Sequence, residues 1–240
     1  VNRKTIKEQL QIASEIFHNL KNILKEQGYS TNVGDEGGFA PNLKNNEEAL
    51  DTIIKAIELS GYKPKEDVLI ALDIAASSFY DNNKKMYLID NTYKTTDQMI
   101  EMYKELIKKY PIFSIEDPLE EQDFIGFAKL TQELQTNIVG DDLYTTNKNL
   151  LQKGIENKST NFILLKANQI GTITEMLETI NLARENNINM IISHRSGETE
   201  DTFISDFAVG LGIPYMKSGS LSRGERICKY NRLLRIEENL

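Results

Sequence analysis

The sequence predicts an α/β fold in which strands and helices alternate around a parallel sheet, in the form of a (β/α) barrel. Three observations predict it. Short, almost continuously apolar runs recur along the chain, as strands buried on both faces require. Amphipathic helical segments separate these runs, and strand-then-helix order is typical of parallel sheets. Most of the runs end on an ionisable residue.

The elements follow from the spacing of apolar residues. The first segment carries them every three or four positions from Ile6 to Leu24 and stops at Gly28, which predicts an amphipathic helix. Five further stretches of this kind predict helices at residues 47–59, 97–110, 124–134, 173–186 and 201–211. The apolar runs predict strands at residues 68–73, 112–116, 138–141, 162–166, 188–194 and, more weakly, 213–217. An Asn- and Lys-rich stretch at 81–98 interrupts this order, and we expect a surface hairpin there.

Alternation alone fits both an open doubly wound sheet and a closed barrel, and the position of the charges decides between them. The charged residues that close the six runs are Asp73, Glu116, Asp141, Lys166, His194-Arg195 and Lys217. In barrels, active-site side chains converge at the carboxyl ends of the strands. A ring of charges therefore favours the barrel, and the lack of any linker-like segment favours a single domain over residues 1–240.

Composition excludes several classes of protein. Lys and Arg number 28 against 36 Asp and Glu, and the net charge of −8 argues against binding to nucleic acid or to an acidic membrane surface. No run approaches the roughly 18 apolar residues of a membrane span, and the first residues lack the apolar core of a signal peptide. The single cysteine, Cys228, cannot form an internal disulfide, so we expect a reducing compartment, the cytoplasm.

Three carboxylates predict a metal site. Asp73, Glu116 and Asp141 each follow an apolar run, so all three are expected at one rim. Any one of them could instead cap a helix or pair with a basic neighbour. Three converging carboxylates would repel one another unless a cation lay between them. Oxygen ligands without His or Cys suit Mg²⁺ better than Zn²⁺.

Cationic and acidic side chains at the same rim predict proton transfer on a phosphorylated carboxylate. Lys166 either extends to solvent or is held partly desolvated near Arg195 and Lys217, and the second arrangement would make it a base. Arg195 and Ser196 precede a glycine and a predicted helix, a combination suited to holding phosphate. Glu36, in a glycine-rich loop at 32–41, is either part of a polar turn or the acid for a leaving group.

Several motifs together resemble those of the enolases. They are Val-Gly-Asp-Glu-Gly-Gly-Phe-Ala-Pro (33–41), Ala-Leu-Asp (71–73), Ser-Ile-Glu-Asp-Pro-Leu (114–119), Gly-Asp-Asp-Leu (140–143), Leu-Lys-Ala-Asn-Gln-Ile-Gly-Thr (165–172), Ser-His-Arg-Ser-Gly-Glu-Thr-Glu-Asp (193–201) and Lys-Ser-Gly-Ser (217–220). The resemblance runs along the whole chain. The stretch 193–201 is the most specific of these motifs, whereas Ala-Leu-Asp alone carries little information.

The resemblance implies a TIM barrel of the enolase kind that dehydrates 2-phosphoglycerate to phosphoenolpyruvate, reversibly, with Mg²⁺. Lys166 is then the base at C2, and Glu36 is the acid at the C3 hydroxyl. Asp73, Glu116 and Asp141 are the implied metal ligands, and the family's spacing to Lys166 selects Asp141 rather than Asp142. The implied substrate-binding residues are Glu36, Glu116, Asp141, Lys166, His194, Arg195, Ser196 and Lys217.

Enolases carry an N-terminal α+β domain and two barrel strands ahead of the segment that opens this sequence. The resemblance therefore implies an incomplete barrel, a homodimer or homo-octamer when full length, and a cytoplasmic protein that is also found at the cell surface or secreted, where it meets surface ligands. Two alternatives stay open. One is an inactive fragment that acts as a binding protein at surfaces. The other is a related Mg²⁺ enzyme with a different carboxylate substrate, which the Arg195-Ser196 pair argues against.

Overall fold

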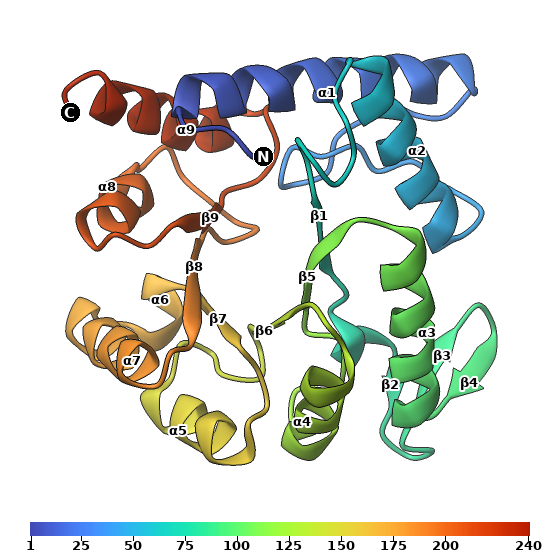
Figure 1. Cartoon of the computed structure of the whole chain (residues 1–240), viewed down its shortest axis with the longest axis vertical. Helices are drawn as coiled ribbons and strands as arrows, with labels where there is room; N and C mark the ends of the chain where they lie inside the picture. The colour runs from blue at the N-terminus through green and yellow to red at the C-terminus, as the bar shows by residue number, and fades with distance from the viewer. The chain divides into compact units, whose positions relative to one another are not determined.

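The computed structural model describes residues 1–240, which form two compact units (Figure 1). The first unit combines Val1–Leu69 with Ser193–Leu240, and the second is the continuous segment Ile70–Ile192. The first five strands in the order of the six-stranded parallel sheet belong to the second unit, and the loop that carries Glu36 belongs to the first. No helix in the chain combines the length and the apolar character that crossing a membrane requires.

A parallel sheet organises the second unit. Its strands lie in the order β1-β5-β6-β7-β8. Their bounds are β1 Ile70–Asp73, β5 Ile112–Glu116, β6 Asn137–Gly140, β7 Phe162–Leu165 and β8 Asn189–Ser193, whose last residue lies in the first unit. In β7 all four residues are buried, because this strand is covered on both faces. Val139, Phe162 and Leu164 form a buried apolar cluster on one side of the sheet.

Helices cover the outer side of this curled sheet. They are α3 Thr96–Lys109, α4 Phe124–Glu133, α5 Lys148–Asn157, the short α6 Ala167–Ile170 and α7 Ile173–Glu185. Helix α3 contacts α4, α4 contacts α5, and α5 contacts α7, so the helices follow the strands in order (Figure 1). Repeated strand-then-helix crossovers of this kind are the building plan of a (β/α) barrel. The predicted fold class is therefore confirmed for this part of the chain.

The excursion expected at 81–98 is a small antiparallel sheet. A 3₁₀ turn, Ala76–Phe79, leads into β2 Tyr80–Asp81, β3 Met86–Ile89 and β4 Thr92–Lys94. Asp90 and Asn91 connect β3 to β4 with φ of 47° and 59°. Two consecutive left-handed residues make the type of turn whose twist matches that of the flanking strands. The predicted hairpin is therefore confirmed.

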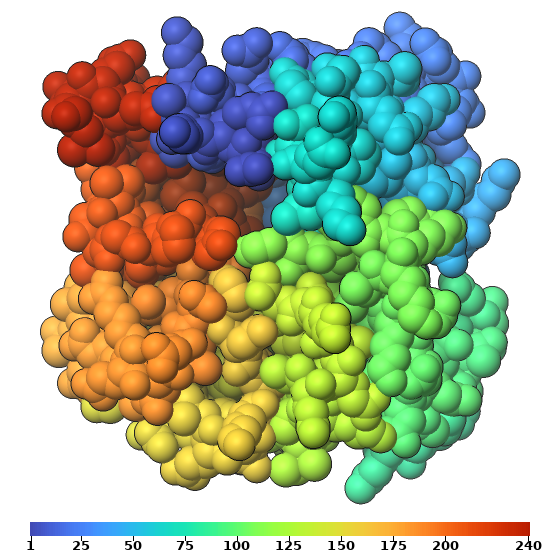
Figure 2. Space-filling model, in the orientation of Figure 1, coloured from blue at the N-terminus to red at the C-terminus, as the bar shows by residue number.

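The first unit is mainly helical. It contains α1 Ile6–Glu26, α2 Asn46–Leu59, α8 Phe203–Gly210, β9 Tyr215–Lys217 and α9 Gly224–Glu237. Helices α1 and α9 lie side by side, as the blue and red segments of Figure 2 show. The Glu237 carboxylate near the end of α9 accepts hydrogen bonds from the backbone N–H groups of Ile6 (2.7 Å) and Lys7 (3.2 Å). A carboxylate there satisfies amides that have no partner within α1 and opposes the positive end of its dipole.

The predicted elements and the observed ones agree closely except for three helices. The predicted strand 112–116 coincides with β5, and the other strand bounds differ by one or two residues. Helices α5, α6 and α9 are absent from the prediction. The buried residues of α9 are Arg226 and Lys229, so a search for apolar periodicity does not find this helix.

Candidate functional site

The sheet of the second unit brings the three predicted carboxylates to one edge. Asp73 and Glu116 end β1 and β5 and are register partners across these neighbouring strands. Glu116 is in turn the partner of Val139 in β6, two residues before Asp141. As register partners, Asp73 and Glu116 belong to the same face of the sheet, and Asp141 directly follows β6. Glu116 and Asp141 are buried, whereas Asp73 is exposed.

Lys166, the predicted base, follows β7 directly and contacts one of these carboxylates. Its Nζ donates to Asp141 Oδ2 at 2.5 Å, and both side chains are largely buried, with 14% and 10% exposed. The Lys166 backbone N–H donates to the hydroxyl of Thr146, which is fully buried. Thr179 of α7 donates to the Thr146 carbonyl at 2.9 Å and anchors that residue in turn. The lysine is therefore held at both its backbone and its ammonium group.

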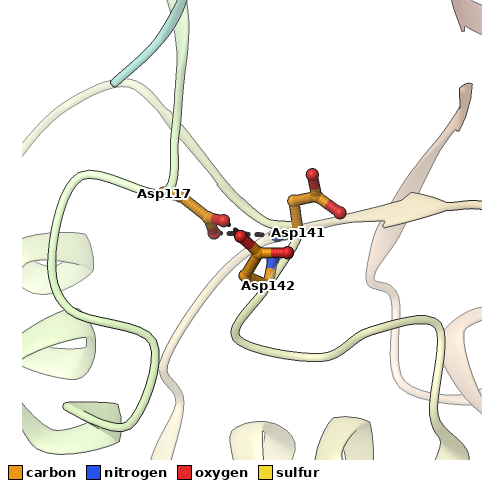
Figure 3. Close-up of side chains that lie close together, drawn as sticks. All are labelled: Asp117, Asp141 and Asp142. Atoms are coloured by element: carbon orange, nitrogen blue, oxygen red, sulfur yellow. Dashed lines mark hydrogen bonds between the residues drawn. The ribbon is translucent and has the colours of Figure 1, made fainter. Parts of the chain in front are cut away.

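Asp117, Asp141 and Asp142 form an acidic cluster that could hold a metal ion, with one carboxylate oxygen of each within 4.8 Å of the others. Asp117 accepts hydrogen bonds from the backbone N–H groups of Asp141 (2.9 Å) and Asp142 (2.7 Å). Figure 3 shows its carboxylate aimed at that backbone, while the Asp141 side chain extends away from it. Burial raises the pKa of Asp117 to about 7, although the two amides act in the opposite direction.

The chemistry of these donors fits a hard cation. The set predicted from the sequence and the cluster found in the structure share Asp141, and both consist of oxygen donors alone. Burial and, to a smaller extent, the charges of Asp141 and Asp142 raise the pKa of Asp117, and a bound cation would oppose both effects. Asp117 itself is occupied with the backbone of the loop that carries Asp141, so it orients that loop. Asp73, Glu116 and Asp141 stay the predicted ligands.

Glu36, the predicted acid, lies in a tight loop of the first unit. Val33 and Phe39 pair across the loop, and the Gly34 N–H donates to the Gly38 carbonyl at 2.9 Å. Gly37 has φ of +80°, and a Cβ built on it would lie 2.6 Å from the Ser222 carbonyl oxygen. Only glycine meets both the backbone conformation and the close approach. The loop is thereby pressed against the segment that precedes α9.

Two residues of the predicted site lie against the Glu36 carboxylate. Ser196 donates its hydroxyl to Glu36 Oε1 at 2.8 Å, and His194 Nε2 lies 3.3 Å from Oε2. The Glu36 side chain keeps 43% of its surface exposed, so its carboxylate is open to a ligand. The Glu36 carbonyl accepts a hydrogen bond from the Ser220 N–H at 2.8 Å. Sequence reasoning placed His194 at the site but not against Glu36.

His194 is the most buried member of this group, with 3% of its surface exposed. Its backbone N–H donates to the Lys217 carbonyl at 2.9 Å, which joins the end of β8 to β9. Burial lowers the pKa of His194; the nearby Glu36 carboxylate opposes this effect, and the Arg226 and Lys217 charges reinforce it. The lowered pKa favours the neutral form of the imidazole.

Each unit thus carries part of the predicted set. The first unit holds Glu36, His194, Arg195, Ser196 and Lys217, and the second holds Asp73, Glu116, Asp141 and Lys166. Arg195 and Lys217 are half-buried, and Ser196 is exposed beside Glu36. It stays a prediction that all nine residues take part in one active site.

Sequence reasoning missed three buried charged residues, namely Asp117, Arg226 and Lys229. The first two bind the backbone of predicted site residues. Asp117 directly follows Glu116, so its position after a strand was visible. Arg226 and Lys229 lie in a basic helix whose pattern is typical of a solvated surface. From the sequence alone, neither residue could be distinguished from an ordinary charged residue on the surface.

A comparison with protein-family models agrees with the fold and with the motifs. The model described as "Enolase, C-terminal TIM barrel domain" matches residues 1–240, which is the whole chain. The match covers both units and all the residues discussed above. The chain belongs to the enolase C-terminal TIM-barrel family.

Proposed function

We propose that this chain is the catalytic barrel of an enolase and dehydrates 2-phosphoglycerate to phosphoenolpyruvate. The observation that carries the proposal is the 2.5 Å contact of Lys166 Nζ with Asp141 Oδ2, a candidate base against a candidate metal ligand at the carboxyl edge of the sheet. Family membership supports an enolase-like lyase activity in general. The substrate, the metal and the residue roles are the proposal.

Lys166 is the proposed base at the carbon next to the substrate carboxylate. Its Nζ takes the C2 proton, and the electron pair of that C–H bond becomes the second bond between C2 and C3. Asp73, Glu116 and Asp141 would hold Mg²⁺, which when bound stabilises the negative charge that develops on the carboxylate. Because Asp141 Oδ2 also accepts a hydrogen bond from Lys166 Nζ, a cation held by Asp141 would compete for that oxygen and leave Nζ free to contact the substrate.

Glu36 is the proposed acid for the leaving group. Its carboxyl group gives a proton to the C3 hydroxyl, the C3–O bond breaks, and the oxygen departs as water. Arg195 and Ser196 bind the phosphate, and Lys217 binds the substrate carboxylate. The proton removed from C2 and the proton given to the hydroxyl balance, so the reaction needs no oxidant or reductant.

The test is the formation of phosphoenolpyruvate, followed by its ultraviolet absorbance, from 2-phosphoglycerate with and without Mg²⁺. The assay is run on this chain and on the chain joined to an enolase N-terminal α+β domain. Lys166→Ala should abolish turnover while the circular dichroism spectrum and unfolding temperature stay close to those of the wild type. Turnover in either form that Lys166→Ala and Mg²⁺ removal abolish supports the proposal.

Absence of turnover in both forms, with folded protein and Mg²⁺ present, refutes the proposal. The remaining hypothesis is then an inactive fragment that acts as a binding protein. Turnover that survives Lys166→Ala refutes the role of the lysine alone. Turnover of a carboxylate substrate without phosphate, at a rate equal to that of 2-phosphoglycerate, refutes the roles of Arg195 and Ser196.

A further inference from the structure

Two cations lie buried in α9 and have no part in the proposed reaction. Arg226 and Lys229 are each 1% exposed, and they are among the largest fully buried side chains of the chain. Burying a charge is costly unless hydrogen bonds compensate for the lost water. The partners of each side chain therefore show what the burial achieves.

Arg226 connects the two loops that carry the acid and the phosphate-binding residues. Its Nη2 donates to the Asp35 carbonyl at 3.0 Å and to the Ser196 carbonyl at 2.7 Å. Its Nη1 donates to the Arg195 carbonyl at 2.8 Å. The methylene Cδ of Arg226 packs where a Cβ on Gly219 would lie, at 2.7 Å. One guanidinium thus binds the backbone of the Glu36 loop and the backbone of the loop that carries Arg195 and Ser196.

The same guanidinium contacts the imidazole of His194, with 2.6 Å between Arg226 Nη1 and His194 Nδ1. A guanidinium has donors only, so Nδ1 must be the acceptor in this hydrogen bond. In a neutral imidazole the other nitrogen then carries the proton. That nitrogen, Nε2, is buried without a hydrogen-bond partner and lies 3.3 Å from Glu36 Oε2.

We propose that Arg226 is a positioning residue that fixes His194 as its Nε2–H tautomer and so presents an N–H group to the Glu36 carboxylate. Ser196 already donates to the other oxygen of that carboxylate. A hydroxyl donor at one oxygen and an N–H group close to the other would stabilise the negative charge that forms on Glu36 after it has given up its proton. The stabilisation of charge on Glu36 rests on the proposed role of Glu36 as the acid. The tautomer of His194 does not depend on that role.

The tautomer is measured directly by ¹⁵N NMR on protein labelled in its histidines. The chain contains two histidines, His18 and His194, and a His18→Gln variant assigns the two sets of signals. At pH 7.5, without substrate or metal, we expect His194 Nε2 to bear the proton and Nδ1 to show the shift of an unprotonated nitrogen. A proton on Nδ1, or on both nitrogens, overturns the proposal.

The role of Arg226 is tested by Arg226→Met against Lys229→Met as the matched control. Lys229 is equally buried in the same helix, but its ammonium donates to the carbonyls of Thr199 and Glu225 and not to His194. Arg226→Met should lose the single Nε2–H state, whereas Lys229→Met should keep it. Retention of the wild-type signals in a folded Arg226→Met protein, or their loss in both variants, refutes the role.

Arg226→Lys gives a second route if Arg226→Met does not fold. A lysine keeps the charge but not the planar set of donors, so we expect a mixture of tautomers and a partial recovery of rate. In protein with enolase activity, Arg226→Met should lower kcat about 10²-fold, as misplacement of a catalytic group by an ångström does. An Arg226→Lys signal identical to that of the wild type, with full activity, counts against the proposal.

The two proposals fail separately. The expected tautomer without any turnover refutes the enolase activity and leaves the role of Arg226 intact. Turnover with an Nδ1–H imidazole refutes the role of Arg226 and leaves the enolase activity intact.

Discussion

Replacing Gly37 by alanine should disturb the Glu36 loop far more than the same change at Gly38. Gly37 has φ of +80°, where an alanine costs about 1–2 kcal/mol. The new Cβ would also lie 2.6 Å from the Ser222 carbonyl oxygen and 2.9 Å from its hydroxyl. At Gly38 no atom lies within 4 Å of an added Cβ, and the backbone needs no left-handed conformation.

The expected loss follows from these contacts. The Ser222 hydroxyl donates to the Gly37 carbonyl at 2.7 Å, and moving the two segments apart would weaken that bond by about 1 kcal/mol. Together with the backbone cost, this gives a loss of about 2–3 kcal/mol in the free energy of unfolding. For a chain of this length, that loss lowers the unfolding temperature by about 4–12 °C. Gly38→Ala should change it by less than about 2 °C.

The assay combines thermal unfolding with phosphoenolpyruvate formation for both variants. Because Glu36 adjoins Gly37, the displaced loop should also lower kcat, by about 10²-fold, at temperatures where the variant is folded. Equal unfolding temperatures for Gly37→Ala and the wild type would refute the steric argument. Equal losses in both variants would show that the loop tolerates no Cβ at all, contrary to the open space at Gly38.

Three further predictions concern the metal cluster, pH and α1. Asp117→Asn should weaken binding of Mg²⁺, measured by titration calorimetry, by about 10–100-fold, and Asp142→Asn should weaken it much less. Because the pKa of His194 is lowered in the folded state, the unfolded state takes up the proton first, so the free energy of unfolding should fall as the pH drops below about 6.5. In urea titrations His194→Gln should flatten that dependence, and an unchanged slope would contradict the assignment. Glu237→Gln should cost about 1 kcal/mol in urea unfolding through its weaker hydrogen bonds to the first turn of α1, and no change would contradict the capping role.

The strands were predictable because burial on both faces leaves a strong sequence signal. The run Phe162–Leu165 is wholly apolar and wholly buried, and the charged residue after it is Lys166. The same reasoning located Glu116 and Asp141 at strand ends. A charge at the end of one buried strand is common, so the prediction depended on charges closing six such strands.

The supporting residues were not predictable, because their role lies in contacts with distant backbone. Arg226 acts on the carbonyls of Asp35, Arg195 and Ser196, which are far away in sequence or belong to no regular element. Asp117 likewise binds amides that lie 24 and 25 positions along the chain. Residue type and periodicity carry no information about such pairings.

The hydrogen bonds of Glu237 to the start of α1 imply an order of assembly during synthesis. The carboxylate reaches an amide 231 positions earlier in the chain. At ordinary rates of translation the start of α1 therefore waits about 10–50 s for this partner. The segment Ile70–Ile192 is continuous and is synthesised within that interval. The first unit, built from both flanking segments, must be completed last, so its helices α1 and α2 depend longest on protection from aggregation.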